Sequence, residues 1–330
     1  MFKLIRLIKT FCLFIFFIFL GMFELKAFRS KIEEPHKGIS SDLIEINIVK
    51  VEYKSKEEDK LNFILKKCAN YCEKLSSAIL FFICEESIQD EVVGPSTPPK
   101  HLYQSRRFAH KLWIKSFFDE TEKSINEYTY DYQLIRKDKN IVEKRILIEK
   151  NGKKKNRKNA KLETRFAHKD IIFGPIGLLG ESAQSQHNYK IVSRDIFADE
   201  KVIIIEAIPK NGFITNHLYG KIWIRENDYG VLKIEWYQES VGGYEVLKEL
   251  AEEGKLRPEF IVTTEFYFEK NGIRFPSKHQ LIESYKSYYS SSSNQKFIKS
   301  KKIVEYKNYK FFLVETEVTN VKEKKEPFNN

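Results

Sequence analysis

The sequence has little of what marks fibrous, low-complexity or disulfide-rich chains. Its 330 residues include 14 glycines, 9 prolines and 4 cysteines. So little glycine and proline excludes a collagen-like or low-complexity chain. The length excludes a disulfide-rich miniprotein and is sufficient to bury a substantial core.

The signatures of common enzyme classes are also missing. The sequence contains no HExxH, GxSxG or P-loop motif. Glu85 and Glu86 are adjacent on a predicted strand, so they point to opposite faces and cannot converge on one substrate. We therefore expect no catalytic residues, no metal site and no cofactor. The seven histidines lack the spacing of metal ligands, so each is expected at the surface or as a cap: His36, His101, His110, His168, His187, His217 and His279.

Aromatic and basic residues, by contrast, are abundant. The 26 phenylalanines and 17 tyrosines, within a hydrophobic share of 42%, favour a folded chain rich in β-strands. The formal net charge of +11 permits an anionic membrane or a nucleic acid as partner and specifies neither.

The first 27 residues have the layout of a secretory signal peptide. Lys3, Arg6 and Lys9 precede an apolar run from 11 to 23, and cleavage is expected after Ala27. The run is shorter than the roughly 20 residues of a spanning helix. We expect an exported, periplasmic protein, for which nucleic acid is an unsuitable partner. The alternative is an uncleaved N-terminal anchor in the inner membrane.

Hydrophobic periodicity then predicts a helix followed by a long series of strands. Residues 28–58 form a polar extension with one short strand at 43–51. Apolar residues recur at helical spacing from Leu61 to Leu75, and a strand is expected over 78–84. Residues 94–123 are a linker or insert. The tail 320–330 is expected to be disordered.

From Glu127 onward the pattern alternates as in antiparallel strands. Turns are expected at Asn151-Gly152, at 226–230 and at Asn271-Gly272, with a short helix over 244–253 closed by Gly254. Further strands are expected at 162–166, 303–306 and 311–318. So long a meander must curl to hide its apolar face. The predicted fold is therefore mainly β (α+β). It is a large curved antiparallel sheet that forms an incomplete β-barrel over residues 59–319, covered by the two helices.

Three cysteines remain after removal of the leader. Cys68 and Cys72 are four apart on a helix, a poor geometry for bonding to each other. Export permits a disulfide between Cys72 and Cys84. The three thiols have no fourth ligand nearby for zinc.

The order of these elements resembles the LolA-like superfamily of periplasmic lipoprotein carriers. The runs that carry the resemblance are 71–75 (YCEKL), 130–134 (YDYQL), 219–224 (YGKIWI) and 271–277 (NGIRFPS). The resemblance implies an incomplete β-barrel whose concave face, closed by helices, holds acyl chains. It transfers no functional residue to this chain.

We therefore expect an exported, non-enzymatic binding or carrier protein for a lipid or a lipoprotein acyl chain. Ile176, Leu178 and Leu179 lie in a glycine-rich run, 173–180, that either forms a lid over a cavity or plugs the core. The alternatives are an envelope assembly partner without a ligand and an exported hydrolase. The residues expected to line the cavity are Ile222, Ile224, Leu232, Ile234, Trp236, Phe260, Val262, Phe266 and Phe268.

A basic cluster surrounds the first predicted turn. It either keeps the edge of the sheet soluble or contacts anionic lipid head groups. Its residues are Lys153, Lys154, Lys155, Arg157 and Lys158, within a longer basic run from 150 to 161.

Overall fold

The computed structural model describes residues 41–80, 82–94, 122–137, 140–211, 218–288 and 296–312, with side chains from residue 56. The chain divides into two units, 1–59 and 60–330. The expected signal peptide, most of the 94–123 insert and the tail 320–330 lie outside the described residues. The helices are α2 (Ser41–Ala78), α4 (Gly174–Leu179), α5 (Glu181–Gln184) and α6 (Tyr244–Glu253), with single 3-10 turns η2 (Ile171–Phe173) and η3 (Gln238–Ser240).

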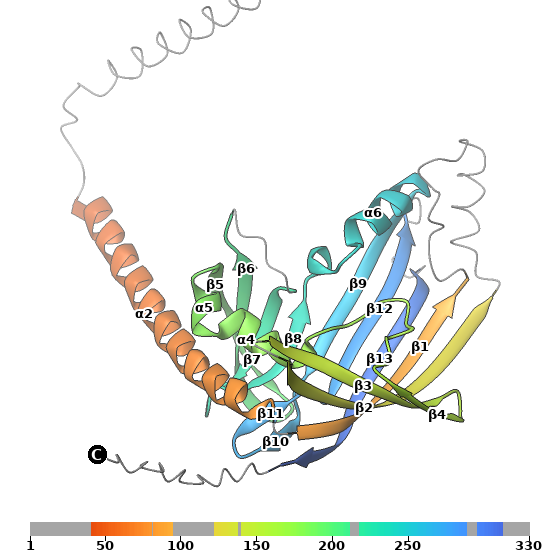
Figure 1. The fold of residues 1–330 in the computed structure, drawn as a ribbon. Helices are drawn as coiled ribbons and strands as arrows, with labels where there is room; N and C mark the ends of the chain where they lie inside the picture. The colour runs from red at the N-terminus through yellow and green to blue at the C-terminus, as the bar shows by residue number, and fades with distance from the viewer. Residues whose placement is uncertain are drawn as a thin grey trace, which may run out of the picture. The chain divides into compact units, whose positions relative to one another are not determined.

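The second unit is built on one antiparallel sheet of eleven strands (Figure 1). Their order is β4-β3-β2-β1-β13-β12-β9-β8-β7-β6-β5, so β4 and β5 are the two edges and the sheet does not close. The prediction of an open, curved, mainly β fold is confirmed. The strands are β1 (Phe82–Val93), β2 (Lys123–Lys137), β3 (Asn140–Lys150), β4 (Lys153–Lys158), β5 (His187–Phe197), β6 (Glu200–Pro209), β7 (Gly220–Arg225), β8 (Val231–Trp236), β9 (Leu256–Glu265), β12 (Lys278–Ser287) and β13 (Lys296–Phe311), with β10 (Phe268–Lys270) and β11 (Ile273–Phe275) forming a separate pair.

Turn chemistry fixes the hairpins. Asn151 and Gly152 both have positive φ, 49° and 73°, and connect β3 to β4. Asn271 and Gly272 do the same, at 52° and 72°, between β10 and β11. Such backbone angles suit Asn-Gly and match the twist of the flanking strands. Both predicted Asn-Gly turns are confirmed.

One face of the sheet carries most of the core. A single cluster of buried side chains extends from Leu147 on β3 to Ile205 on β6 and includes the predicted helix face at Leu65, Cys68 and Leu75. Helix α6 packs on the same sheet through Tyr244, whose ring lies 5.6 Å from that of Phe260. Both predicted helices therefore help to bury the strands.

Several element predictions are wrong. The expected strand at 43–51 belongs to α2, because no glycine or proline interrupts the chain between Ser41 and Ala78 and the helix continues. Residues 162–166 form no strand. The expected pair at 303–306 and 311–318 is one strand, β13, as far as Phe311, and it pairs with both β1 and β12. The residues beyond 312 lie outside the described residues.

The disulfide that export permits between Cys72 and Cys84 is not formed in the structure. Cys68, Cys72 and Cys84 are free and buried. Cys72 points to the neighbouring helix, where its Sγ lies 3.4 Å from the carbonyl oxygen of Pro175. Burial in the core raises the pKa of the Cys68 thiol to about 12, which keeps it protonated.

The glycine-rich run 173–180 is helical instead of a loop. Pro175 lies in the first turn of α4, where its missing N–H costs nothing. Leu178 and Leu179 are fully buried in the main core, while Ile176 is partly buried. The Tyr189 hydroxyl donates to the Leu178 carbonyl over 2.5 Å. In this structure the two leucines therefore fill the core.

Truncating Leu178 tests this packing. Leu178→Ala is expected to lower the free energy of unfolding by about 2–5 kcal/mol, because it leaves a cavity in a fully buried site. Ile176→Ala, on the same helix and only partly buried, serves as the matched control with a smaller loss. Urea denaturation measures both. Equal losses would contradict the assignment of Leu178 to the core.

Candidate functional site

A cavity of about 1270 Å³ lies over the sheet between the segment 165–177 and helix α6. Most of its lining is apolar, which is the usual make-up of a small-molecule site. The apolar lining residues are Ile141, Phe166, Ala167, Ile171, Phe173, Leu218, Trp236, Val241, Val246, Leu247, Val262 and Leu281. Polar lining comes from Arg165, His168, Lys169, Asp170, Ser240, His279 and Lys302, together with Asn140.

Two of the residues predicted to line a cavity, Trp236 and Val262, line this one. Ile222, Ile224, Ile234, Phe260 and Phe266 are buried in the main core, and Phe268 packs against it. Leu232 lies in a second cluster with Val202 and Ile204. Of the glycine-rich run, Phe173, Gly174 and Gly177 line the cavity.

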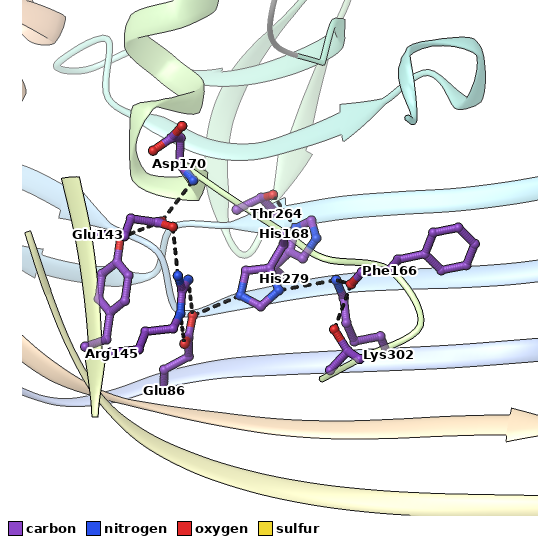
Figure 2. Close-up of polar contacts among 11 residues, drawn as sticks. Glu86, Glu143, Arg145, Phe166, His168, Asp170, Thr264, His279 and Lys302 are labelled. Atoms are coloured by element: carbon purple, nitrogen blue, oxygen red, sulfur yellow. Dashed lines mark hydrogen bonds and ion pairs between the residues drawn. The ribbon is translucent and has the colours of Figure 1, made fainter. Parts of the chain in front are cut away.

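A buried polar network forms part of the wall (Figure 2). At its centre is the Glu86 carboxylate on β1, which is fully buried. Arg145 on β3 donates to it from Nε over 2.6 Å and from Nη2 over 3.0 Å. His168 Nε2 lies 2.9 Å away on the other side. The bidentate geometry is the strong form of an arginine–carboxylate pair.

A second carboxylate extends the network. Glu143 accepts from Arg145 Nη1 over 2.8 Å, from the Tyr132 hydroxyl over 2.9 Å and from the Asp170 backbone N–H over 2.9 Å. These bonds connect β2 and β3 to the start of η2. The network therefore fixes the segment that forms one side of the cavity.

His168 is held as a neutral imidazole. Its Nε2–H donates to Glu86, and its Nδ1 lies 3.3 Å from the Lys302 ammonium, which can only donate. Burial, reinforced by the charge of Lys302, lowers the pKa of His168 to about 4. Burial alone would raise the pKa of Glu86, but hydrogen bonds from His168 and Arg145 outweigh it and lower that pKa to about 2.

His279 lies beside His168, with ring centroids 5.7 Å apart. Its Nδ1 is 3.0 Å from the Thr264 hydroxyl, which accepts from the Trp236 indole N–H over 2.9 Å. The hydroxyl therefore keeps its own hydrogen and one further acceptor position for its contact with Nδ1. Burial lowers the pKa of His279 well below its ordinary value.

Sequence reasoning missed this network. The expectation of surface or capping histidines is wrong for His168 and His279, which are buried in the polar network. His187 is buried too, and its Nδ1 lies 2.9 Å from the Ala183 carbonyl oxygen at the end of α5, as expected for a capping residue. Glu86 and Asp90 are buried too, on the same side of β1 as Cys84 and Ile88. Strand alternation alone could have placed the two carboxylates inward.

The five residues of the basic cluster lie on the edge strand β4, and all six residues of that strand are exposed. Arg157 and Lys150 both pair with Glu163. Lysines on an edge strand oppose pairing with another sheet. Contact of this strand with anionic lipid stays a prediction.

No protein-family model and no curated protein matches the sequence. Among solved structures, the chain is similar to a DUF1329 family protein from Desulfovibrio piger, with 8% identity over 77% of this chain and 94% of that chain and a TM-score of 0.36. It is also similar to a LolA superfamily protein from Nitrosomonas europaea, with 10% identity over 77% and 94% and a TM-score of 0.29. A third is a putative outer membrane lipoprotein-sorting protein domain from Vibrio parahaemolyticus, with 9% identity over 78% and 95% and a TM-score of 0.32.

The described residues lack two features that would point to other functions. No helix there combines the length and apolarity needed to cross a membrane. In the same residues, no three histidine, cysteine, aspartate or glutamate side chains gather as metal ligands would.

The network makes stability depend on pH. The folded-state pKa of His168 is about 4, below its ordinary value of 6.5, so the unfolded chain binds more protons and stability falls as the pH drops through this range. His279 acts in the same direction, and Glu86 adds to the loss below its ordinary pKa of 4.5.

We therefore expect the free energy of unfolding to fall by about 1.4 kcal/mol per pH unit for each of His168 and His279 below pH 6. His168→Gln retains an N–H donor for Glu86 and should reduce this slope, with His279 responsible for the remainder. Urea denaturation at pH 7, 6 and 5 measures the slopes. If the free energy of unfolding of His168→Gln falls with pH as steeply as that of the wild type, the assignment to His168 is contradicted.

Proposed function

We propose that the protein is an exported, non-enzymatic carrier that binds one lipid-like amphiphile in the cavity over its sheet. Residues 1–27 would direct the export. The observation that carries the proposal is the cavity itself, which has a volume of about 1270 Å³. Its walls are mainly apolar side chains, and a smaller number of polar side chains also line it. The interior of a purely structural domain is close-packed and does not leave an apolar space of this size.

Burial of an alkyl chain supplies the binding energy. Each methylene transferred from water contributes about 0.8 kcal/mol, so a long chain can outweigh its lost freedom of motion. Trp236 and Val262 form part of the sheet side of the cavity, with Val246 and Leu247 of α6 opposite. Trp236 is held in place because its indole N–H donates to Thr264. A preformed wall of this kind suits a slender apolar ligand.

The buried polar groups fit a binding role better than hydrolysis. His168 is bonded on both ring nitrogens, to Glu86 and Lys302, so neither nitrogen is available to activate a nucleophile. Glu86 is in turn occupied by Arg145. Their arrangement supports the wall of the cavity.

Filling the cavity tests the proposal. Gly242 lines it, and a side chain added there meets open space, with nothing within 4 Å of a Cβ. Gly242→Trp should therefore fold normally but weaken binding of the neutral apolar dye N-phenyl-1-naphthylamine by at least about tenfold, since the indole occupies ligand space. Dye fluorescence measures the affinity, and displacement by palmitate identifies the site.

Glu249→Trp is the matched control. Glu249 lies on the exposed face of α6 and does not line the cavity, so the same bulk there should leave dye binding unchanged. Wild-type protein that binds neither dye nor palmitate would refute a carrier and leave the assembly-partner alternative. Equal affinity of both variants would place the binding elsewhere.

A further inference from the structure

The charges that face the cavity are unbalanced. Arg165, Lys169 and Lys302 line it, and Asp170 is the single lining carboxylate among the described residues. The acidic partners in the surrounding networks, Glu86, Glu143 and Glu283, are not part of the lining. The cavity wall is thus apolar with a cationic region at one place.

Lys302 on β13 is the most deeply buried of these cations, at 1% exposure. Its Nζ donates to the Phe166 carbonyl over 2.7 Å and lies 3.3 Å from His168 Nδ1. Both partners are neutral, and one of the three ammonium hydrogens remains. In the part of the chain that the structure describes, no carboxylate oxygen comes within ion-pair distance of this nitrogen.

Two buried carboxylates, Asp90 and Glu86, attract the Lys302 ammonium, but each already has other hydrogen-bond partners and neither forms an ion pair with it. Glu86 is already compensated by its bidentate bond to Arg145. Burial raises the pKa of Asp90, and one of its oxygens already accepts from the Arg165 backbone N–H over 3.0 Å. A buried ammonium without an adjacent anion is costly, so a counter-ion supplied by a ligand would stabilise it.

We propose that Lys302 binds the anionic head group of the amphiphile, a carboxylate or a phosphate, while the alkyl chain lies along the apolar wall. This assignment rests on the proposed carrier function. An anionic oxygen bonded to Lys302 forms a charge-assisted hydrogen bond in a poorly solvated place, where such bonds are strong. His279 also lines the cavity.

The test compares three ligands that share one sixteen-carbon chain and differ in head group: palmitate, hexadecyl phosphate and hexadecanol. Each displaces N-phenyl-1-naphthylamine from the wild-type protein at pH 7. The anionic ligands should bind about ten- to a hundredfold more tightly than the alcohol, as expected for a hydrogen bond to a charged group. Whichever anion binds more tightly identifies the head-group class.

Lys302→Met keeps the length of the side chain and removes its charge. It should abolish the preference for anions and leave hexadecanol binding unchanged. Lys299→Met is the matched control, because Lys299 is a buried lysine on the same strand that does not line the cavity. That variant should retain the preference.

The outcomes separate the two proposals. If none of the three ligands displaces the dye, the carrier function itself is refuted. If all three bind equally to the wild type, the head-group site is refuted while the carrier function stands, and this comparison needs no variant to fold. A preference that survives in folded Lys302→Met overturns the assignment to Lys302.

Discussion

An open sheet must have its apolar face covered, and this requirement shapes the second unit. Eleven strands that do not close leave a wide apolar surface, so helices have to bury it. The part of α2 from Leu65 onward does so beside α4 and α5. Gln184 donates to the Leu65 carbonyl over 2.7 Å, and the Arg274 backbone N–H donates to the Tyr71 hydroxyl over 3.0 Å.

The helices pack closely on one part of the sheet and leave space over another part, and that space is the cavity. Where Leu178 and Leu179 enter the core, the space is filled. Toward α6 the segment 165–177 and the helix form walls instead, and about 1270 Å³ stays open. The wall beside β1 and β3 is made rigid by charged groups, because Glu86 and Arg145 must remain together once both are buried. The cavity is therefore the part of the sheet that the helices do not fill, and the polar network lies in its wall.

Local signals predicted much of the fold. Asn-Gly turns, the apolar stripe from Leu61 to Leu75 and the Gly254 end of α6 depend on neighbouring residues, and the structure has all three. Long-range partners were not accessible in this way. Arg145 and His168 lie 59 and 82 residues from Glu86, and no local pattern connects them.

Two other predictions, the face of Leu232 and the strand at 43–51, were wrong for local reasons. Leu232 and Ile234 are two residues apart on one strand, so strand alternation predicts that both side chains lie on the same face. The pairing of β7 with β8 shifts register between Trp223 and Ile224, so Leu232 lies among the residues of the second cluster. At 43–51 the isoleucines alternate as they would in a strand, but the segment belongs to a helix that contains no glycine or proline before it ends at Ala78. Periodicity is reliable only while register is continuous.

The central claim is that the cavity holds an amphiphile. Native mass spectrometry of the full chain, purified without detergent from its expression host, tests it most directly. The account predicts a population heavier than the polypeptide by the mass of one lipid-like molecule, which gentle collisional activation releases, and which Gly242→Trp lacks. Wild-type protein found only at its bare polypeptide mass, and still bare after incubation with palmitate, would contradict it.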